Sequence, residues 1–274
     1  MDYVLYFLSI VWYTLGAVVL CGLFVSLCEW LFRRLAGGKV GRALILGTSI
    51  IGTPVHESGH ALMCLIFGHK IRSMCLWNPK APDGNLGYVT HSFNTKNPYH
   101  QIGNLFIGIG PIFSGLAVTA ALLALCFPET WSAYLEAAAD VVTTGRTPWV
   151  MLWEGFKLWP HMLGEDSVAL WLKIPAIFLI LSISLHVRLS PADIKGSLYA
   201  LPLYLVVVLI FTVITALFGR TVMSAIQNGL AVFLAVTVSL FTIVLSFSVA
   251  LVLVALIIWA LRRLFTSVLI GKKR

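Results

Sequence analysis

Apolar runs of membrane-spanning length dominate the chain, and polar residues gather in short segments between them. A helix that crosses the hydrocarbon core of a bilayer needs ~20 predominantly apolar residues. The last apolar run is long for one crossing and short for two, which is typical of a single tilted helix. The pattern predicts about six transmembrane helices, at residues 4–28, 43–68, 101–127, 168–188, 197–218 and 229–260.

Two of the connecting segments are longer than a simple turn. The first, residues 68–100, contains "GNLGYVTHSF" directly after Pro82-Asp83, and this pattern predicts a short β-hairpin beside the membrane. The second, residues 128–166, alternates tryptophan with acidic residues, which predicts one or two helices lying in the membrane interface. The expected fold is therefore an all-α polytopic membrane protein, with residues 1–274 forming a single integral membrane domain.

The composition agrees with this class. The chain is 59% hydrophobic and 11% charged, and its mean hydropathy is +0.93, which excludes an ordinary soluble domain. The five cysteines contain no CxxC pair, so no disulfide framework is expected. The net charge of +8 is concentrated in loops and at the C-terminal tail, a distribution that indicates membrane orientation and no nucleic-acid partner. The positive-inside rule then predicts a multi-pass protein with both termini in the cytoplasm.

Residues 56–60, inside the second apolar run, read His-Glu-Ser-Gly-His. Positions i and i+4 lie on one face of a helix, so His56 and His60 can reach one metal ion. Glu57 comes directly after the first histidine, where it can accept a proton from water and leave the metal to the imidazoles. Zinc suits such a site because three protein ligands leave one coordination position open.

The position of these ionisable residues inside an apolar run favours a functional role for them. Ionisable side chains at membrane depth cost at least ~2.5–3.5 kcal/mol on insertion scales, so they are rarely retained without a role. The alternative is a polar cluster that is hydrogen-bonded between helices, without a metal. Pro54, two residues before His56, predicts a kink or a restart of the helix that would admit water.

A third ligand is needed, and Asp193 at the end of the fourth span is the best candidate. Spans two and four run in the same direction, so both ends approach the same face of the membrane. Alternatively, Asp193 pairs with Arg188 or Lys195. His186 is a possible additional ligand, and Cys64 is expected to be a small core residue. Glu154, Glu165 and Asp166 are weaker ligand candidates, and His69, His91, His100 and His161 are expected to be solvated or interfacial.

The sequence resembles the site-2 protease family of intramembrane zinc metalloproteases. The resemblance rests on the HExxH motif in a transmembrane segment, on Gly110-Pro111 in the next span and on a Pro-x-Asp near the end of a later one. It covers a core of about residues 43–196 and leaves out the spans at 4–28, 197–218 and 229–260. The family usually has an asparagine where this chain has Ser114, and a glycine after the aspartate where it has Ile194, so the chain resembles a divergent member.

The resemblance implies a zinc-dependent endopeptidase. His56, His60 and Asp193 would hold one Zn²⁺, Glu57 would activate water, and the substrate would be a transmembrane or membrane-anchored protein or peptide. Substrate contacts are expected from Tyr88, Val89 and Ser114. Two other functions remain open: a non-catalytic membrane binding protein derived from such a protease, and a metal transporter.

Overall fold

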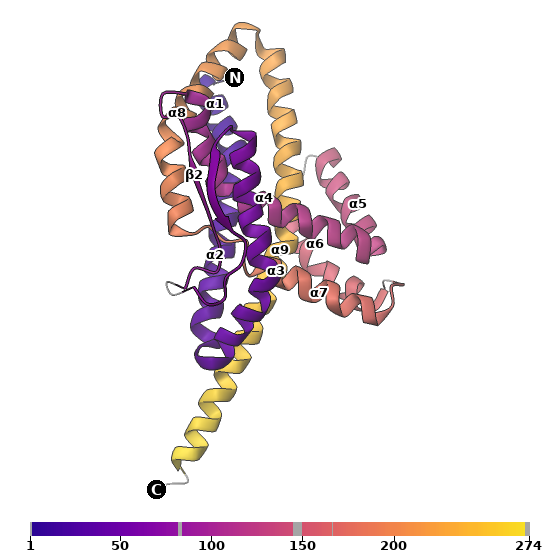
Figure 1. Cartoon of the computed structure of the whole chain (residues 1–274). Coiled ribbons are helices and arrows are strands. Elements are labelled where there is room, and N and C mark those ends of the chain that lie inside the picture. Colours follow the sequence, from indigo (N-terminus) through magenta and orange to yellow (C-terminus); the bar gives the residue numbers. More distant parts are fainter. Residues whose placement is uncertain (1, 82–83, 145–149, 166, 272–274) are drawn as a thin grey trace.

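The computed structural model describes residues 2–81, 84–144, 150–165 and 167–271, and it is predominantly helical (Figure 1). The chain forms nine α-helices, two β-strands and two π-helical turns within these residues. The N-terminal helices α1 and α2 are joined by a π-helical turn into one continuous rod. In chain order the elements are α1 (Tyr3–Val11), a π-helical turn (Trp12–Gly16), α2 (Ala17–Ala36), α3 (Gly38–Ile66), β1 (Lys70–Cys75), β2 (Tyr88–Ser92), α4 (Pro98–Cys126), α5 (Pro128–Thr144), α6 (Met151–Pro160), a second π-helical turn (His161–Glu165), α7 (Leu170–Ser184), α8 (Pro191–Leu217) and α9 (Arg220–Gly271).

Four helical segments are long and apolar enough to cross a membrane. They are Tyr3–Ala36, Pro98–Cys126, Pro191–Leu217 and Arg220–Leu264. Only 28% of the most apolar window of α8 is buried within the protein, so most of this hydrophobic surface faces outward. Water would penalise such exposure, whereas lipid tails would not. The fold therefore indicates a mostly helical membrane protein.

The other two predicted spans correspond to helices that are less apolar or shorter than a membrane crossing requires. The run at 43–68 corresponds to α3, whose centre carries polar and ionisable residues that lower its hydropathy. The run at 168–188 corresponds to α7, which has 15 residues and ends at Ser184. The residues between Ser184 and Pro191 are not helical. At ~1.5 Å per residue, α7 extends only about 22 Å, which is less than the ~30 Å of hydrocarbon.

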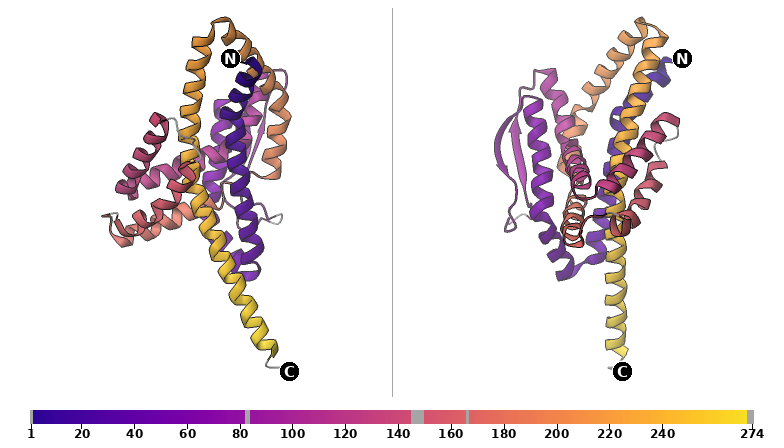
Figure 2. Two further views of the ribbon diagram at one scale, coloured as in Figure 1. Left: turned by 180° about the vertical axis from the view of Figure 1, so that it is seen from behind. Right: turned by 90° about the vertical axis from the view of Figure 1, so that its right-hand side faces the viewer.

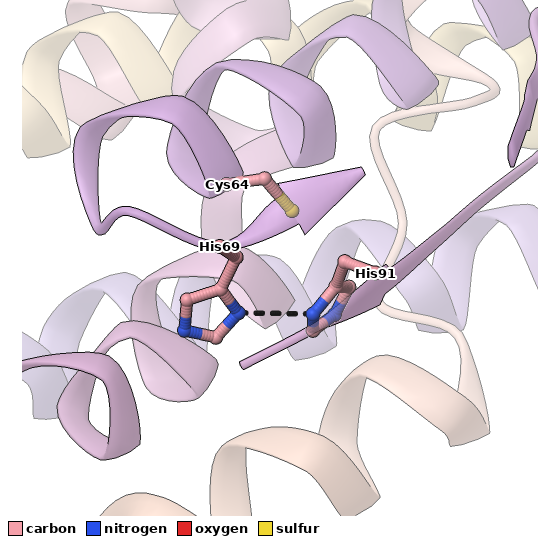
Figure 3. Close-up of side chains that lie close together, drawn as sticks. All are labelled: Cys64, His69 and His91. Atoms are coloured by element: carbon pink, nitrogen blue, oxygen red, sulfur yellow. Dashed lines mark hydrogen bonds between the residues drawn. The ribbon is translucent and has the colours of Figure 1, made fainter. Parts of the chain in front are cut away.

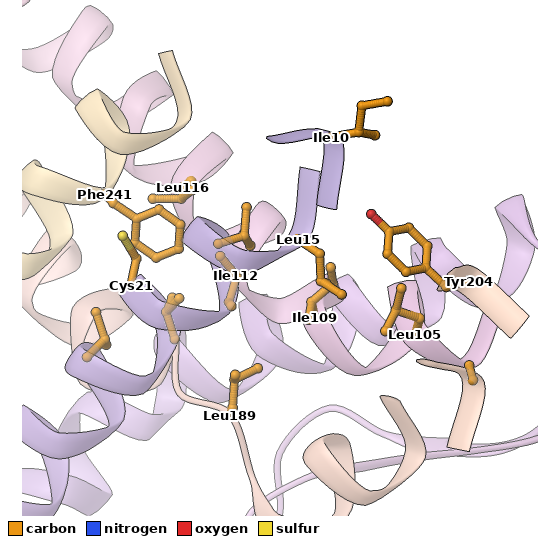
Figure 4. Packing of buried hydrophobic residues seen from close by; sticks show 14 of the residues in the cluster. Ile10, Leu15, Cys21, Leu105, Ile109, Ile112, Leu116, Leu189, Tyr204 and Phe241 are labelled. Atoms are coloured by element: carbon orange, nitrogen blue, oxygen red, sulfur yellow. The ribbon is translucent and has the colours of Figure 1, made fainter. Parts of the chain in front are cut away.

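The largest buried cluster joins the N-terminal helices to α4, α8 and α9. Figure 4 shows Leu15 and Cys21 from the first rod facing Ile109 and Ile112 of α4, with Phe241 of α9 at one side. Leu189, in the connection between α7 and α8, belongs to the same cluster. This packing places the beginning of α8 beside α4, and the candidate ligand Asp193 lies in the first turn of α8.

Close backbone contact joins α3 to α4. A Cβ atom at Gly59 would lie 2.6 Å from the carbonyl oxygen of Gly110, so only glycine fits at this position. Ser114 strengthens the contact, because its hydroxyl donates to the carbonyl of Val55 across 2.8 Å. The turn of α3 that carries the HExxH motif is thereby held against the backbone of α4.

The two strands pair antiparallel, with Lys70 opposite Ser92 and Cys75 opposite Tyr88. They lie along α3 on one side of the molecule (Figure 2). The Pro82-Asp83 pair of the predicted turn lies outside the described residues. The placement of this sheet beside a membrane stays a prediction.

Helices α5, α6 and α7 project sideways from the main bundle (Figure 1). Phe127, Tyr134 and Met151 pack with Ile180 and Phe247 in a second buried cluster, which ties this group to α9. The sequence predicted one or two helices in residues 128–166, and α5 and α6 occupy this segment. Their predicted position in a membrane interface is not tested by the fold.

Helix α9 is a continuous helix of 52 residues, so it extends about 78 Å. The predicted single helix at 229–260 is therefore longer at both ends than the hydropathy pattern indicated. Figure 1 shows the start of α1 and the end of α9 toward opposite ends of the molecule's long axis. This arrangement gives no support to the prediction that both termini face the cytoplasm, which stays a prediction.

Candidate metal centre

The HExxH residues lie on an unbroken helix. Pro54 is inside α3, which continues from Gly38 to Ile66, so the predicted restart of the helix does not occur. The rings of His56 and His60 lie one turn apart with centroids separated by 4.9 Å. Their Nε2 atoms are 3.2 Å apart, so both imidazoles point to one place.

Backbone carbonyls from two other segments fix the orientation of the two rings. The Nδ1 atom of His56 lies 2.8 Å from the carbonyl oxygen of His186, and Nδ1 of His60 lies 2.7 Å from that of Ile107. A carbonyl oxygen can only accept, so each Nδ1 carries the hydrogen. In the neutral imidazoles both Nε2 atoms then present lone pairs. Metal-ligating histidines in proteins are oriented in this way.

Asp193 completes the group. Its Oδ1 atom lies 3.2 Å from Nε2 of His60, and its Oδ2 atom lies 3.9 Å from Nε2 of His56. All three ligand atoms are within 4.8 Å of one another, close enough to hold a single metal ion. The structure therefore brings together the three ligands that the sequence suggested. No ion pair joins Asp193 to Arg188 or Lys195 in the part of the chain that the structure describes.

Local sequence explains the position of Asp193. Ser190 caps α8, Pro191 occupies the first turn, and the side chains of Ser190 and Asp193 each accept a hydrogen bond from the other's backbone N–H. This is a capping box, which fixes the rotamer of the residue at its third helical position. The prediction that Asp193 lies at the end of a span is wrong, because the residue begins α8.

Glu57 projects beside the three ligand atoms without joining them. The residue is 6% exposed and lines a cavity of about 380 Å³ together with His56, His60 and Asp193. The segment before β2 covers this part of the cavity. A Cβ atom at Gly87 would lie 2.8 Å from Cγ of Glu57, so the chain passes directly over the carboxylate-bearing side chain.

Two arginines that the sequence analysis treated as loop charges line the same cavity. Arg33 of α2 forms an ion pair with buried Glu29, and Arg188 lies 3.8 Å from the same carboxylate. Two cations therefore face one buried anion. Arg188 also interacts electrostatically with Asp193, so its positive charge offsets part of the charge of that carboxylate. Glu29 and Arg33 are four residues apart on α2, but sequence alone could not reveal the approach of Arg188, which lies 159 positions after Glu29.

The remaining candidates are placed as follows. Tyr88 and Val89 begin β2 and line the cavity. The ring of His186 does not join the ligand group; its Nδ1 donates to the carbonyl of Ser182, and its backbone supports His56. Ser114 is outside the cavity lining and serves the α3–α4 contact, so the predicted substrate contact finds no support.

The acidic alternatives are also accounted for. Glu154 pairs with Lys157 across 2.8 Å on α6, away from the cavity. Asp166 and the side chain of Glu165 lie outside the described residues. Comparison of the chain with protein-family models, with curated proteins and with solved structures finds no match. The functional argument therefore depends on the geometry of the cavity.

Proposed function

We propose that this protein is an intramembrane zinc metalloprotease, a divergent relative of the site-2 protease family. One observation carries the proposal. The Nε2 lone pair of His60 lies 3.2 Å from Nε2 of His56 and 3.2 Å from a carboxylate oxygen of Asp193, although all three groups are acceptors. Such a group is repulsive unless a cation or a shared proton lies between its members. Zinc, with three protein ligands and an open position, satisfies the group and leaves room for a reactant.

The residues have distinct roles in this proposal. His56, His60 and Asp193 hold the metal, and Glu57, beside them in the cavity, acts as the general base. Bound zinc supplies a Lewis acid that polarises a carbonyl and makes water more acidic. Glu57 accepts the proton of the attacking water and returns it to the leaving amine. A non-catalytic metal site would have no use for a buried base at this position.

The membrane arrangement is part of the proposal. We place α3 in the bilayer as a fifth crossing and α7, together with the connection at residues 185–190, as a sixth, with a core at residues 43–196. Helix α3 packs against α4 and α7, and α7 packs against α4 and α9, so polar groups at these contacts need not face lipid. The protein is then a multi-pass integral membrane protein acting on a transmembrane or membrane-anchored protein or peptide.

A helical substrate must unwind before hydrolysis, because its carbonyls are engaged in its own hydrogen bonds. We propose that the edge of β2 holds the unwound segment as an added strand. Two features support this proposal. Tyr88 and Val89 line the cavity, and the backbone of the segment before them passes over the side chain of Glu57.

Val89→Pro tests the strand addition. Proline removes a backbone donor and distorts the strand, and the loss of one or two hydrogen bonds costs about 1–3 kcal/mol. Cleavage of a helical single-span substrate is expected to fall roughly tenfold or more, whereas Val89→Ala retains the wild-type rate. Unchanged cleavage of the helical substrate by Val89→Pro would remove β2 from the mechanism.

The metal dependence tests the proposed class. Purified wild-type protein in liposomes is expected to contain zinc and to hydrolyse a reconstituted single-span substrate, with products identified by mass spectrometry. A zinc chelator abolishes the hydrolysis, and added zinc restores it. Protein that binds no zinc at micromolar concentration, or that cleaves equally well without metal, contradicts the proposal.

A further inference from the structure

A second group of metal-ligating side chains lies one helical turn beyond the first. Cys64 continues the face of α3 that carries His56 and His60, about 6 Å further along the axis. His69 precedes β1 and His91 lies in β2. The thiol sulfur of Cys64 and one ring nitrogen from each histidine are all within 4.8 Å of one another. Figure 3 shows the sulfur directed toward the two rings.

The sequence analysis expected His69 and His91 to be solvated or interfacial, and His69 is not solvated. The residue is 4% exposed, and its ring stacks on Phe93 with a centroid separation of 4.7 Å. Cys64 is fully buried, in agreement with its expected core position. Burial lowers the pKa of both His69 and His91.

Hydrogen bonding fixes which nitrogen of His69 is free. Its Nε2 lies 2.8 Å from the carbonyl oxygen of His100 and must carry the hydrogen, because the carbonyl only accepts. The Nδ1 atom of neutral His69 therefore has a lone pair, which faces Nδ1 of His91 at 2.9 Å. This is the same orientation by a backbone carbonyl that His56 and His60 receive. It is the arrangement expected of a metal ligand.

We propose that Cys64, His69 and His91 form a second zinc site. Zinc bonds of ~2.1 Å to nitrogen and ~2.3 Å to sulfur separate tetrahedral ligands by roughly 3.3–3.7 Å, so the two rings need to move apart by only a few tenths of an ångström. Binding converts the Cys64 thiol to a thiolate and releases its proton to solvent. The described residues supply three ligands, and water completes the coordination.

The site has a structural consequence. The bound metal joins the last turns of α3 to both strands of the sheet, and β2 is the strand whose first residues line the cavity. Zinc therefore fixes the position of β2 relative to the HExxH turn. This second site does not depend on the proposed proteolysis, since it shares no ligand with the first group.

Cobalt absorption distinguishes the two sites. Co²⁺ replaces Zn²⁺ in tetrahedral sites, and thiolate ligation gives an intense near-ultraviolet charge-transfer band that imidazole and carboxylate ligands do not give. Metal-free wild-type protein titrated with Co²⁺ is expected to show this band. Cys64→Ser abolishes it, whereas Cys126→Ser, which changes a cysteine near the second buried cluster, retains it.

A second variant keeps the test independent of any folding defect at Cys64. His91→Ala alters a partly exposed strand residue, and it is expected to raise the Co²⁺ concentration needed for half-saturation of the band by about 10-fold or more. Zinc content falls by one ion per chain in both Cys64→Ser and His91→Ala. Absence of the band in the wild type, or its persistence in Cys64→Ser, overturns the second site.

Discussion

Glu57→Gln is expected to retain its zinc and to lose peptide hydrolysis by about 10²–10⁴-fold, the usual contribution of a general base. Glutamine preserves the shape of the side chain but cannot accept a proton from water. The variant should therefore fold and load metal normally, because Glu57 is not among the three converging ligand atoms. Zinc content by atomic emission and initial rates in liposomes measure the two quantities separately.

The matched control is Glu154→Gln. This residue is a glutamate on α6 that pairs with Lys157 and does not line the cavity. The same chemical change there should leave both zinc content and hydrolysis at wild-type values. Wild-type hydrolysis in metal-loaded Glu57→Gln would refute the proposed mechanism, and loss of zinc from this variant would show that Glu57 is itself a ligand.

Asp193→Asn is the second large effect. An amide binds zinc far more weakly than a carboxylate, so the zinc affinity of the first site should fall by at least about 100-fold. Loss of a residue that only hydrogen-bonds to a metal ligand lowers the affinity less than this. Hydrolysis falls in parallel, because the metal is absent at ordinary zinc concentration. The measurement is best made in the Cys64→Ser background, where zinc bound at the proposed second site does not contribute.

Ser190→Ala serves as the control for the helix cap. It removes the hydroxyl that accepts from the backbone N–H of Asp193 but keeps the backbone N–H of residue 190 that holds Oδ2. The variant should lose about 0.5–2 kcal/mol of stability and keep its zinc affinity. Wild-type zinc affinity in Asp193→Asn would show that the third ligand is another residue.

The shared-proton alternative makes a different prediction for the same variants. If a proton occupies the space between His60 and Asp193, neither Asp193→Asn nor a chelator changes the metal content, which is low from the start. The protein would then fit the second class considered from the sequence, a non-catalytic membrane binding protein. The metal measurements therefore separate a metal site from a proton-bridged polar cluster before any substrate is known.

The sequence alone determined the features that depend on local spacing and length. Four of the predicted apolar runs form helices long enough to cross a membrane, because hydropathy over a window of that length is a property of the segment itself. The pairing of His56 with His60 follows in the same way from the 3.6-residue helical period. Both inferences need no knowledge of neighbouring segments.

Only the tertiary structure decided the features that depend on distant segments. Asp193 approaches His60 because the packing of α4 and α8 brings together residues 133 positions apart, and the helix that contains Asp193 begins where the sequence predicted one to end. Backbone carbonyls orient the imidazoles, and the sequence does not mark which carbonyls do so, because every residue has one backbone carbonyl. Cys64, His69 and His91 meet only because the strands fold back along α3, and hydrophobic periodicity contains no information about that contact.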